Sequence, residues 1–239
     1  MKAYATTDVG KCREVNQDYV FCSEQQIGKL ANLFVVADGM GGHRAGDIAS
    51  RHTVEVLLDE IRNSDADNPI TIISNAISVA NKKILELAGT AEEYYGMGTT
   101  LVVCTVVNDV VYIANVGDSR LYVYDKGLQQ ITRDHSLVEE MINLGKLERS
   151  EARVHEKKNI ITRAVGGSEE VIADFFEAEV KSGSSIIMCS DGLTNMVEDE
   201  VIEEVLKSNA SIQEKADRLL EYANENGGKD NIAIVIIEL

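Results

Sequence analysis

Apolar residues recur every three or four positions in two segments of the chain, and this spacing predicts two helices. One apolar stripe runs through residues 73–87 and the other through residues 212–223. The positions between are mostly polar in both segments, as expected for helices that cover a core and face solvent. A third helix is predicted to begin near His43 and to carry apolar residues as far as Ile61.

Five short runs of apolar residues, rich in β-branched side chains, predict strands. Asn108-Asp109 separates two of them and has the chemistry of a hairpin turn, as does Asp125-Lys126-Gly127 further on. Hairpins pair strands antiparallel, and unbroken apolar runs indicate strands covered on both faces. The sequence therefore predicts an α+β fold, a four-layer α-β-β-α sandwich of two antiparallel sheets flanked by helices. The runs span residues 33–37, 101–107, 110–116, 185–190 and 232–237.

The charge balance excludes two kinds of partner. The chain of 239 residues carries 23 Lys and Arg against 40 Asp and Glu, a formal net charge of −17. Nucleic acids and anionic membranes attract basic surfaces, so neither is expected to be a partner. Hydrophobic residues make up 44% and Pro69 is the only proline, which favours one folded domain over residues 1–239. We expect this domain to be a monomer.

The first residues and the cysteines indicate the compartment. The N-terminal segment lacks the apolar region of a signal peptide, and no stretch approaches the roughly 18 apolar residues of a membrane span. Cys12, Cys22, Cys104 and Cys189 are scattered singly, without the spacing of a zinc site. We therefore expect a soluble cytoplasmic protein with reduced thiols.

Four of the predicted strands have an aspartate at one end. Asp38, Asp118 and Asp191 each follow an apolar run, and Asp230 precedes the last one. The end of one antiparallel strand lies beside the start of its neighbour, so these carboxylates can meet at one rim of the sandwich. Carboxylates held close together need a cation, and oxygen-only ligands favour Mg²⁺ or Mn²⁺. A single Asp-Gly pair is more typical of a turn, so on this pattern alone turns and a metal site both stay open.

Two further features near Asp38 in the sequence or at the predicted site allow more than one interpretation. The Gly-rich stretch 39–46 leads into a predicted helix, as nucleotide-binding loops do. Its spacing matches neither the dinucleotide fingerprint nor the P-loop, because Arg44 stands where the fingerprint needs Gly and no Gly-Lys-Ser/Thr follows. Arg13 is either an ordinary surface charge or a bidentate clamp for phosphate oxygens beside the acidic site.

Six short motifs are spread over the chain: Arg13-x-x-Asn16-Gln17-Asp18, Asp38-Gly39-Met40-Gly41-Gly42, Gly98-Thr99-Thr100, Gly117-Asp118-Ser119-Arg120, Ser190-Asp191-Gly192-Leu193 and Asp230-Asn231. In this order and at this spacing they resemble the bacterial metal-dependent Ser/Thr protein phosphatases of type 2C, the PPM family. The resemblance covers the chain from end to end and is far more specific than any single Asp-Gly pair. The chain resembles the bare catalytic domain of that family, without a sensor or membrane segment.

The resemblance implies roles for the acidic residues. Asp38 resembles the acid that bridges two catalytic metal ions, and Gly39 the residue whose backbone carbonyl binds the second ion. Asp191 and Asp230 resemble the remaining side-chain ligands of the first ion. Asp118 resembles the acid that, together with Asp191, holds a third and weaker ion in bacterial members. The implied cofactors are two Mn²⁺ or Mg²⁺ ions, with a third site beside them.

Other positions follow from the same resemblance. Asp18 resembles an acid that orders metal-bound water, and Arg13 the arginine that binds the substrate phosphate. Eukaryotic members carry a histidine, proposed as general acid, where this chain has Met40, and His43 is the nearest imidazole. His43 is therefore a candidate proton donor, or it merely begins the helix. Gln17 stands where many eukaryotic members have an acidic ligand.

Residues 132–163 are highly charged and weakly periodic, and they match the variable flap that the family places beside the active site and implicates in substrate selection. Residues 136–144 within this segment are predicted to be helical. The resemblance further implies hydrolysis of phosphoserine and phosphothreonine by a metal-bridging hydroxide, without a phosphoenzyme. The implied partners are phosphoproteins, among them a bacterial Hanks-type Ser/Thr kinase and its substrates, whose signalling the enzyme would reverse.

Two other functions stay open at this point. The same carboxylate scaffold could hydrolyse a small phosphometabolite, which rates on phosphopeptides and sugar phosphates would separate. The fold could also be an inactive module that recognises phosphoproteins. The intact set of acids speaks against an inactive module, because such a copy has no physical need to hold repelling carboxylates together.

Overall fold

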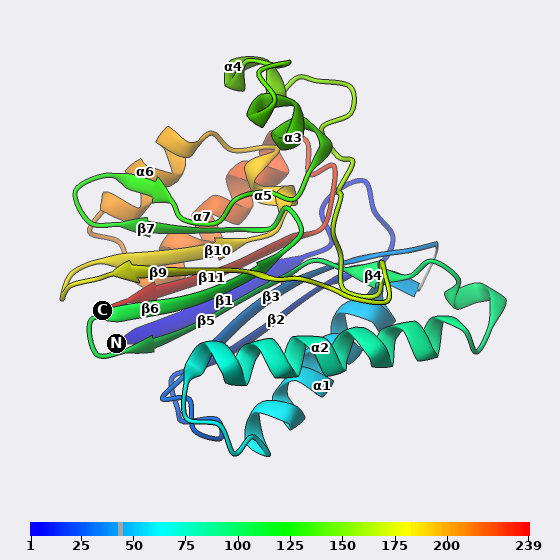
Figure 1. Ribbon diagram of the computed structural model, residues 1–239. Coiled ribbons are helices and arrows are strands. Elements are labelled where there is room, and N and C mark those ends of the chain that lie inside the picture. Colours follow the sequence, from blue (N-terminus) through cyan, green and yellow to red (C-terminus); the bar gives the residue numbers. More distant parts are fainter. Residues whose placement is uncertain (43–44) are drawn as a thin grey trace.

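The computed structural model describes residues 1–42 and 45–239, and its elements stack in four layers (Figure 1). Two antiparallel sheets face each other, and helices cover the outer face of each, so the predicted α+β sandwich is confirmed. The strands are β1 (Lys2–Asp8), β2 (Asp18–Ser23), β3 (Leu33–Met40), β4 (Gly98–Thr99), β5 (Leu101–Val107), β6 (Val110–Val116), β7 (Arg120–Tyr124), β8 (Leu128–Gln130), β9 (Asp174–Glu179), β10 (Ser185–Cys189) and β11 (Ile232–Glu238). The helices are α1 (Ala45–Arg62), α2 (Pro69–Ala88), the short 3-10 helix η1 (Glu92–Tyr94), α3 (Leu137–Asn143), α4 (Arg149–Ala152), α5 (Asp191–Thr194), α6 (Asp199–Lys207) and α7 (Ile212–Glu225).

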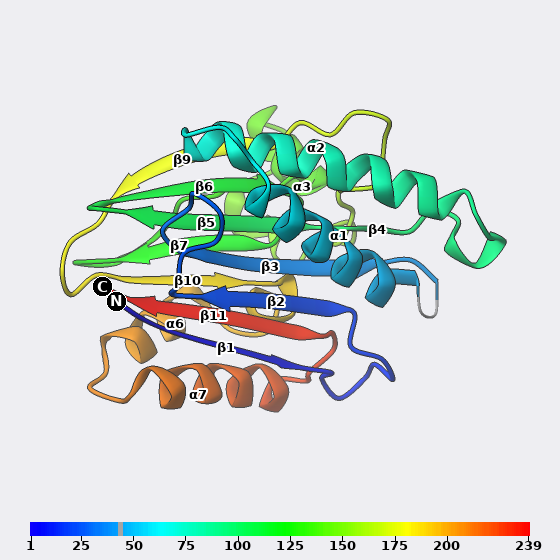
Figure 2. The same cartoon turned by 90° about the horizontal axis from the view of Figure 1, so that it is seen from below.

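The two sheets have simple strand orders. The first runs β1-β11-β10-β7-β8 and the second β2-β3-β5-β6-β9, with β4 paired to β3 outside this path. The strand pairs are antiparallel. Both predicted hairpins are present, and Asn108 adopts the left-handed φ of +54° that Asn tolerates in a tight turn. In Figure 2 α1 and α2 cross the second sheet, while α7 lies along β1 of the first.

Alternate residues of the central strands enter two different cores. In β3, Leu33 and Val35 pack toward α1 and α2, whereas Phe34 and Val36 pack between the sheets. β11 divides in the same way between the intersheet core and the core under α5, α6 and α7. Both faces of these strands are therefore buried, which is why they appear in the sequence as unbroken apolar runs.

Several elements were not predicted from the pattern. β1, β2 and β9 lie at sheet edges, and most of their residues are only partly buried. Their mixed composition therefore gives no clear apolar run. α6 was also missed, because its acidic first turn hides a short apolar stripe. The predicted helix near residue 43 corresponds to α1, whose described part begins at Ala45.

Residues 132–163, called the flap from here on, project from the sandwich and carry α3 and α4 (Figure 1). The predicted helix at 136–144 is confirmed as α3, and the hydroxyl of Ser136 caps it. The two ends of the flap are joined at its base. The Leu137 N–H donates to the Ile160 carbonyl, and the Thr162 N–H donates to the carbonyl of His135. The flap is therefore a single insertion whose two ends are hydrogen-bonded to each other where it leaves the sandwich.

The structure shows the state of the cysteines and the character of the helices. The four cysteines are unpaired, and Cys104 and Cys189 are buried. Burial raises the pKa of both buried thiols, which keeps them protonated and unreactive. Across the part of the chain that the structure describes, no helix has the length and apolar character to span a membrane.

Candidate active site

The aspartates predicted to meet at one rim do surround one cavity. Asp38 and Asp118 come from the second sheet, at the end of β3 and just after β6. Asp191 and Asp230 come from the first sheet, directly after β10 and before β11. The cavity has a volume of about 250 Å³, and residues from both sheets supply its acids. Its other lining residues are Arg13, Gln17, Gly39, Met40, Gly41, Thr100, Asn159 and Ile161.

A glycine lets two of these acids come together. Gly192 follows Asp191, and a β-carbon on it would overlap the carbonyl oxygen of Asn231. Since Asn231 follows Asp230, this close backbone approach sets the two aspartates side by side. The requirement for glycine at this position is therefore steric.

Gly192→Ala is expected to lower the free energy of unfolding by about 3 kcal/mol, because no rotamer relieves an overlap with a backbone atom. Urea denaturation measures the change. Gly127→Ala is the matched control, since its added β-carbon would meet only a carboxylate oxygen of Glu203 at 3.8 Å. Equal stability of the two variants would contradict the close approach.

The Gly98-Thr99-Thr100 motif fixes the backbone of Asp38. The Asp38 N–H donates to Thr100 Oγ1 over 3.0 Å. The Asp38 carbonyl accepts from Thr99 Oγ1 at 2.9 Å and from the Thr100 N–H at 2.8 Å. These bonds hold the residue in β3 and leave its carboxylate to face the cavity.

Asp18 lies behind the cavity wall, opposite Asp38 in the pairing of β2 with β3. It is buried, and its Oδ2 accepts a hydrogen bond of 2.6 Å from the Ser190 hydroxyl. Its Oδ1 is buried and accepts no hydrogen bond from a donor among the described residues. A buried carboxylate oxygen without a donor is costly, so this atom favours an ordered group beside it, and the ordering of water by Asp18 stays a prediction.

The acids raise one another's pKa. Burial raises the pKa of Asp38 well above its ordinary value, and the charges of Asp18 and Asp191 raise it further. Burial, followed by the charge of Asp191, raises the pKa of Asp118 to about 8. The pKa of Asp191 rises to about 6 through burial and the charge of Asp230. The set cannot stay fully ionised at neutral pH without a compensating positive charge.

The donor chemistry of this cavity fits a hard divalent cation. The side chains that face it offer carboxylate oxygens, and a cation would offset their repulsion. Within residues 1–42 and 45–239, no three Asp, Glu, His or Cys side chains are already arranged around one point as ligands of an ion. The acids thus surround the cavity, but their side chains do not converge on a single ligand position. The groups that could hold Mn²⁺ or Mg²⁺ are Asp38, Asp118, Asp191, Asp230 and the carbonyl of Gly39.

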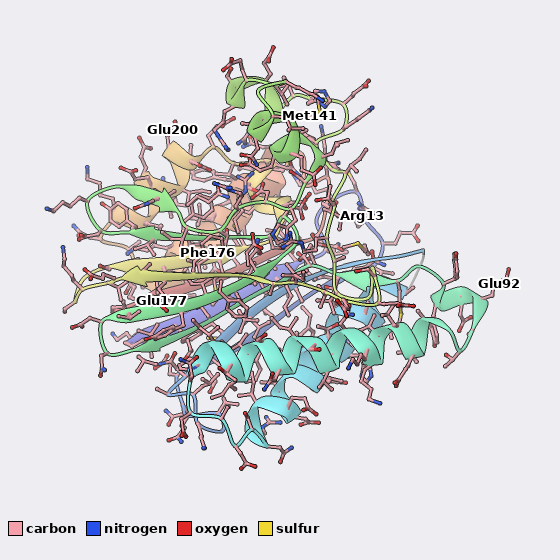
Figure 3. All side chains as sticks on the ribbon, in the orientation of Figure 1. Arg13, Glu92, Met141, Phe176, Glu177 and Glu200 are labelled. Carbon is pink, nitrogen blue, oxygen red and sulfur yellow. The ribbon has the colours of Figure 1, made fainter. Side chains whose placement is uncertain are left out.

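Arg13 stands at the rim of the same cavity. Its guanidinium lies 2.8 Å from Asp230 Oδ2, and its side chain is 51% exposed. This hydrogen bond raises the pKa of Arg13, and it uses one of the five N–H donors of the group. In Figure 3 Arg13 lies below the flap helix that carries Met141. Arg13 therefore keeps donors for an anion.

The loop that carries Arg13 is held by Asn231. The Asn231 side chain accepts from the Gln17 N–H at 2.8 Å and donates to the carbonyls of Val9 and Val15. Asn231 therefore helps to fix the loop of Arg13 beside Asp230, together with the bonds from the Lys11 and Cys12 N–H groups to the Gly228 carbonyl. Its place in the Asp230-Asn231 motif was visible in the sequence, but this contact was not.

A buried histidine holds the turn that carries Asp118. The Gly117 N–H donates to His135 Nδ1 at 3.0 Å, and the His135 N–H donates to the Gly117 carbonyl at 2.9 Å. Since Nδ1 accepts, the neutral ring carries its proton on Nε2, which lies 3.1 Å from Asp174 Oδ2. Burial lowers the pKa of His135 and favours this neutral form. No sequence signal indicated the role of His135, because its partners are backbone groups and a distant strand.

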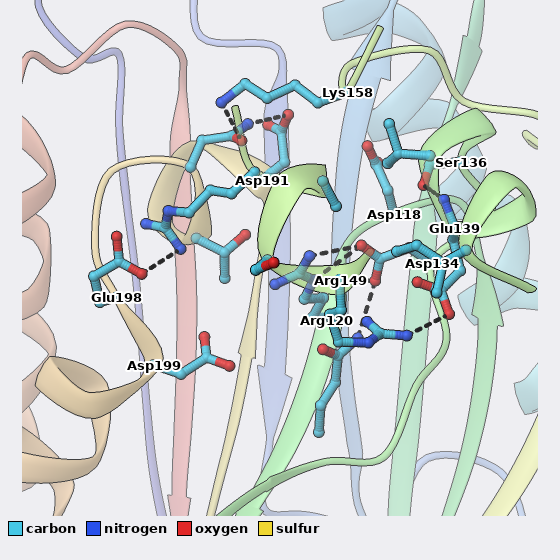
Figure 4. Close-up of a pocket in the computed structure, with 18 of the residues that line it drawn as sticks. Asp118, Arg120, Asp134, Ser136, Glu139, Arg149, Lys158, Asp191, Glu198 and Asp199 are labelled. Carbon is cyan, nitrogen blue, oxygen red and sulfur yellow. Dashed lines mark hydrogen bonds and ion pairs between the residues drawn. The ribbon is translucent and has the colours of Figure 1, made fainter. Parts of the chain in front are cut away.

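A second, larger cavity of about 470 Å³ adjoins the first, between the flap and the segment with α5 and α6 (Figure 4). The two cavities share Asp118 and Asp191. An ion pair of 3.0 Å between Arg153 and Glu198 joins the flap to the residue before α6. The flap therefore lies beside the acidic site, as the resemblance implied.

One predicted residue is not placed. His43 lies outside the described residues, so its role as a proton donor stays a prediction. Met40 and Gln17 both line the smaller cavity, at the positions where the sequence departs from eukaryotic members.

Comparisons with known proteins agree with this geometry. The family model described as protein phosphatase 2C matches residues 11–233. The serine/threonine phosphatase stp of Listeria monocytogenes is 40% identical, over 100% of this chain and 96% of the relative. The protein phosphatase PhpP of Streptococcus pneumoniae is 36% identical, over 100% of this chain and 98% of the relative.

Solved structures have the same fold. The serine/threonine phosphatase of S. agalactiae superposes with a TM-score of 0.92 at 36% identity, over 100% of this chain and 99% of that one. The catalytic domain of the serine/threonine protein phosphatase PstP, solved with two manganese ions, has a TM-score of 0.86 at 32% identity, over 98% and 96% of the two chains. With a family match over residues 11–233 and these relatives along its whole length, this chain belongs to the protein phosphatase 2C family.

Proposed function

We propose that this protein is a bacterial Ser/Thr protein phosphatase that hydrolyses phosphoserine and phosphothreonine with Mn²⁺ or Mg²⁺ as cofactor. The observation that carries the proposal is the cavity in which four strand-end aspartates and Arg13 face one another. Carboxylates alone would repel a phosphate, whereas carboxylates that bind cations, beside an arginine, attract it. The printed names of the Listeria and Streptococcus relatives support this activity.

The aspartates have separate proposed roles. Asp38 would hold both catalytic ions, Asp191 and Asp230 would complete the first, and the carbonyl of Gly39 would contribute to the second. Asp118 and Asp191 would hold a third ion. When bound, such ions lower the pKa of water toward neutrality and offset the charge of the phosphoryl oxygens. The two manganese ions in PstP support the cofactor.

The remaining residues bind substrate and order the site. Arg13 binds the phosphate through donors that its contact with Asp230 leaves over. Asp18, held by Ser190, orders water next to Asp38. His43 is a candidate proton donor, and a His43→Gln variant with an unchanged pH profile of kcat would remove it from the reaction.

Arg13→Lys is expected to raise KM for a phosphothreonine peptide about 10-fold with a smaller change in kcat, because lysine keeps the charge and lacks the planar fork. Steady-state kinetics in Mn²⁺ measure both parameters. Arg51→Lys makes the same change on α1, where the arginine pairs with Asp47 of its own helix, and should leave KM unaltered. An unchanged KM in Arg13→Lys would remove Arg13 from the phosphate site.

We also propose a biological setting for this activity. The physiological substrates are phosphoproteins, among them a Hanks-type Ser/Thr kinase and its targets. Residues 1–239 act as one catalytic domain and a monomer in the cytoplasm, where the unpaired cysteines fit a reducing environment.

The test of the function is metal-dependent hydrolysis. Turnover of a phosphothreonine peptide is measured with Mn²⁺, with Mg²⁺ and with chelator, and compared with turnover of sugar phosphates. We expect peptide hydrolysis in both metals and none in chelator. Activity confined to sugar phosphates would indicate a phosphometabolite hydrolase instead. No metal-dependent turnover at all would indicate a binding module.

A further inference from the structure

A chain of hydrogen bonds runs from the flap to one of the aspartates of the site. Lys158 Nζ donates to Asn195 Oδ1 over 3.0 Å, and Asn195 Nδ2 donates to Asp191 Oδ2 over 2.8 Å. All three side chains line the larger cavity. Figure 4 shows Lys158 reaching toward the group that includes Asp191.

The chemistry of the three groups fixes the orientation of the amide. An ammonium group only donates and a carboxylate only accepts, so Asn195 must turn its oxygen to Lys158 and its NH₂ to Asp191. The backbone of Asn195 is fixed as well, because its N–H donates to the Asp191 carbonyl at 2.7 Å where α5 ends. An apolar side chain at this position would satisfy neither neighbour.

This chain of hydrogen bonds depends on the position of the flap. Lys158 belongs to the flap, whereas Asn195 and Asp191 belong to the sandwich. The ion pair of Arg153 with Glu198 is a second contact between the same two parts, but it does not lead to the acids of the site. Movement of the flap away from α5 would therefore break the bond of Lys158 and leave Asn195 without its partner on that side.

We propose that Lys158 and Asn195 are positioning residues that couple the flap to the metal site. Asn195 orients the carboxylate of Asp191, and Lys158 holds Asn195 when the flap is seated. This inference rests on the proposed function, in which Asp191 is a metal ligand. The bond from Asn195 engages Oδ2 and leaves Oδ1 of the carboxylate to the cation.

Such coupling is reciprocal. If the seated flap strengthens cation binding, then cation binding must stabilise the seated flap by the same factor. The proposal therefore predicts two effects that can be measured separately, one at the site and one in the flap.

Mn²⁺ binding to the metal-depleted protein is measured by calorimetry in the wild type and in four variants. Asn195→Ala is expected to raise the dissociation constant about 10-fold. Lys158→Met is expected to raise it about 5-fold. Lys157→Met is the matched control, because it removes the same charge from an exposed neighbour and should bind as the wild type does. The double variant Lys158→Met/Asn195→Ala should bind Mn²⁺ no more weakly than Asn195→Ala, since both residues act through the same chain of hydrogen bonds.

Hydrogen exchange of the flap amides gives the second readout. Mn²⁺ is expected to slow exchange in the wild type and in Lys157→Met, and to have about 5-fold less effect in Lys158→Met. A role of Lys158 in stability alone would change exchange without metal and leave this response intact, which would overturn the proposal.

The binding data also separate the proposal from its premise. If Lys158→Met binds Mn²⁺ as tightly as Lys157→Met, the coupling is wrong even where Asn195→Ala weakens binding. If Asn195→Ala does not fold, the comparison of Mn²⁺ binding between Lys158→Met and Lys157→Met alone tests the coupling. No hydrolysis is measured, so a protein that binds Mn²⁺ without phosphatase activity still tests the coupling. A wild type that binds no Mn²⁺ would overturn both the proposed function and this inference.

Discussion

Asp38→Asn is expected to lower kcat at least about 1,000-fold and, in the metal-free protein, to raise the melting temperature. Activity is lost because Asp38 is proposed to hold both catalytic ions. Stability rises because burial, followed by the charges of Asp18 and Asp191, raises the pKa of Asp38, so the metal-free folded state must either protonate this carboxyl or bury its charge, and asparagine avoids both costs. The two properties should move in opposite directions, as is common at sites whose function opposes stability.

Turnover of a phosphothreonine peptide in Mn²⁺ and melting in EDTA measure the two effects. Asp217→Asn, the same substitution at an exposed position of α7, should alter neither. Near-wild-type turnover of Asp38→Asn would contradict the assignment of Asp38 as a metal ligand. Lost activity together with a lower melting temperature would mean that the substitution damaged the fold.

The metal-free protein is expected to lose stability between about pH 6.5 and 9, by roughly 10 °C in melting temperature. Burial raises the pKa of Asp18 and of Asp118 to about 8, against about 4 in an unfolded chain. Over this range the folded state binds more protons than the unfolded state, so the free energy of unfolding falls as pH rises. This contribution is complete below about pH 4 and is lost as pH rises through 8. His135, whose pKa burial lowers, acts in the opposite sense only below about pH 6.5.

Thermal melting in EDTA and in saturating Mn²⁺ measures this dependence. Protons and cations compete for the same carboxylates, so Mn²⁺ should raise the melting temperature more at pH 8.5 than at pH 6.5. Asp118→Asn should flatten the slope in EDTA. A melting temperature in EDTA that stays level or rises over this range would contradict the shifted pKa values.

The central layers of the fold could be predicted because burial on both faces leaves a clear signal. Continuous apolar runs such as Leu101–Val107 allow few polar positions. Edge strands such as β9, with sequence Asp-Phe-Phe-Glu-Ala-Glu, have one neighbour and tolerate charge. Their pairing is decided by the adjacent strand, which local pattern does not show.

The site was predictable to the extent that its chemistry lies in short motifs. Asp191 and Asp230 stand at adjacent ends of the paired strands β10 and β11, so antiparallel pairing predicts that they meet, whereas Asp38 joins them through the packing of one sheet on the other. His135 and Asn195 could not be found in this way. Their partners, the Gly117 backbone and the Lys158 ammonium, lie 18 and 37 positions away, and only the folded chain brings them together.

The division of the acids between the two sheets has a consequence for when activity appears during folding. Asp38 belongs to one sheet, Asp191 and Asp230 flank strands of the other, and Asp118 lies in the turn that joins the two sheets between β6 and β7. A chain whose sheets have formed but have not yet docked holds two separate half-sites, each with too few ligands to compete for scarce cations. Catalytic competence would then arise only in the last step of assembly, so a partly folded molecule would be unable to dephosphorylate anything.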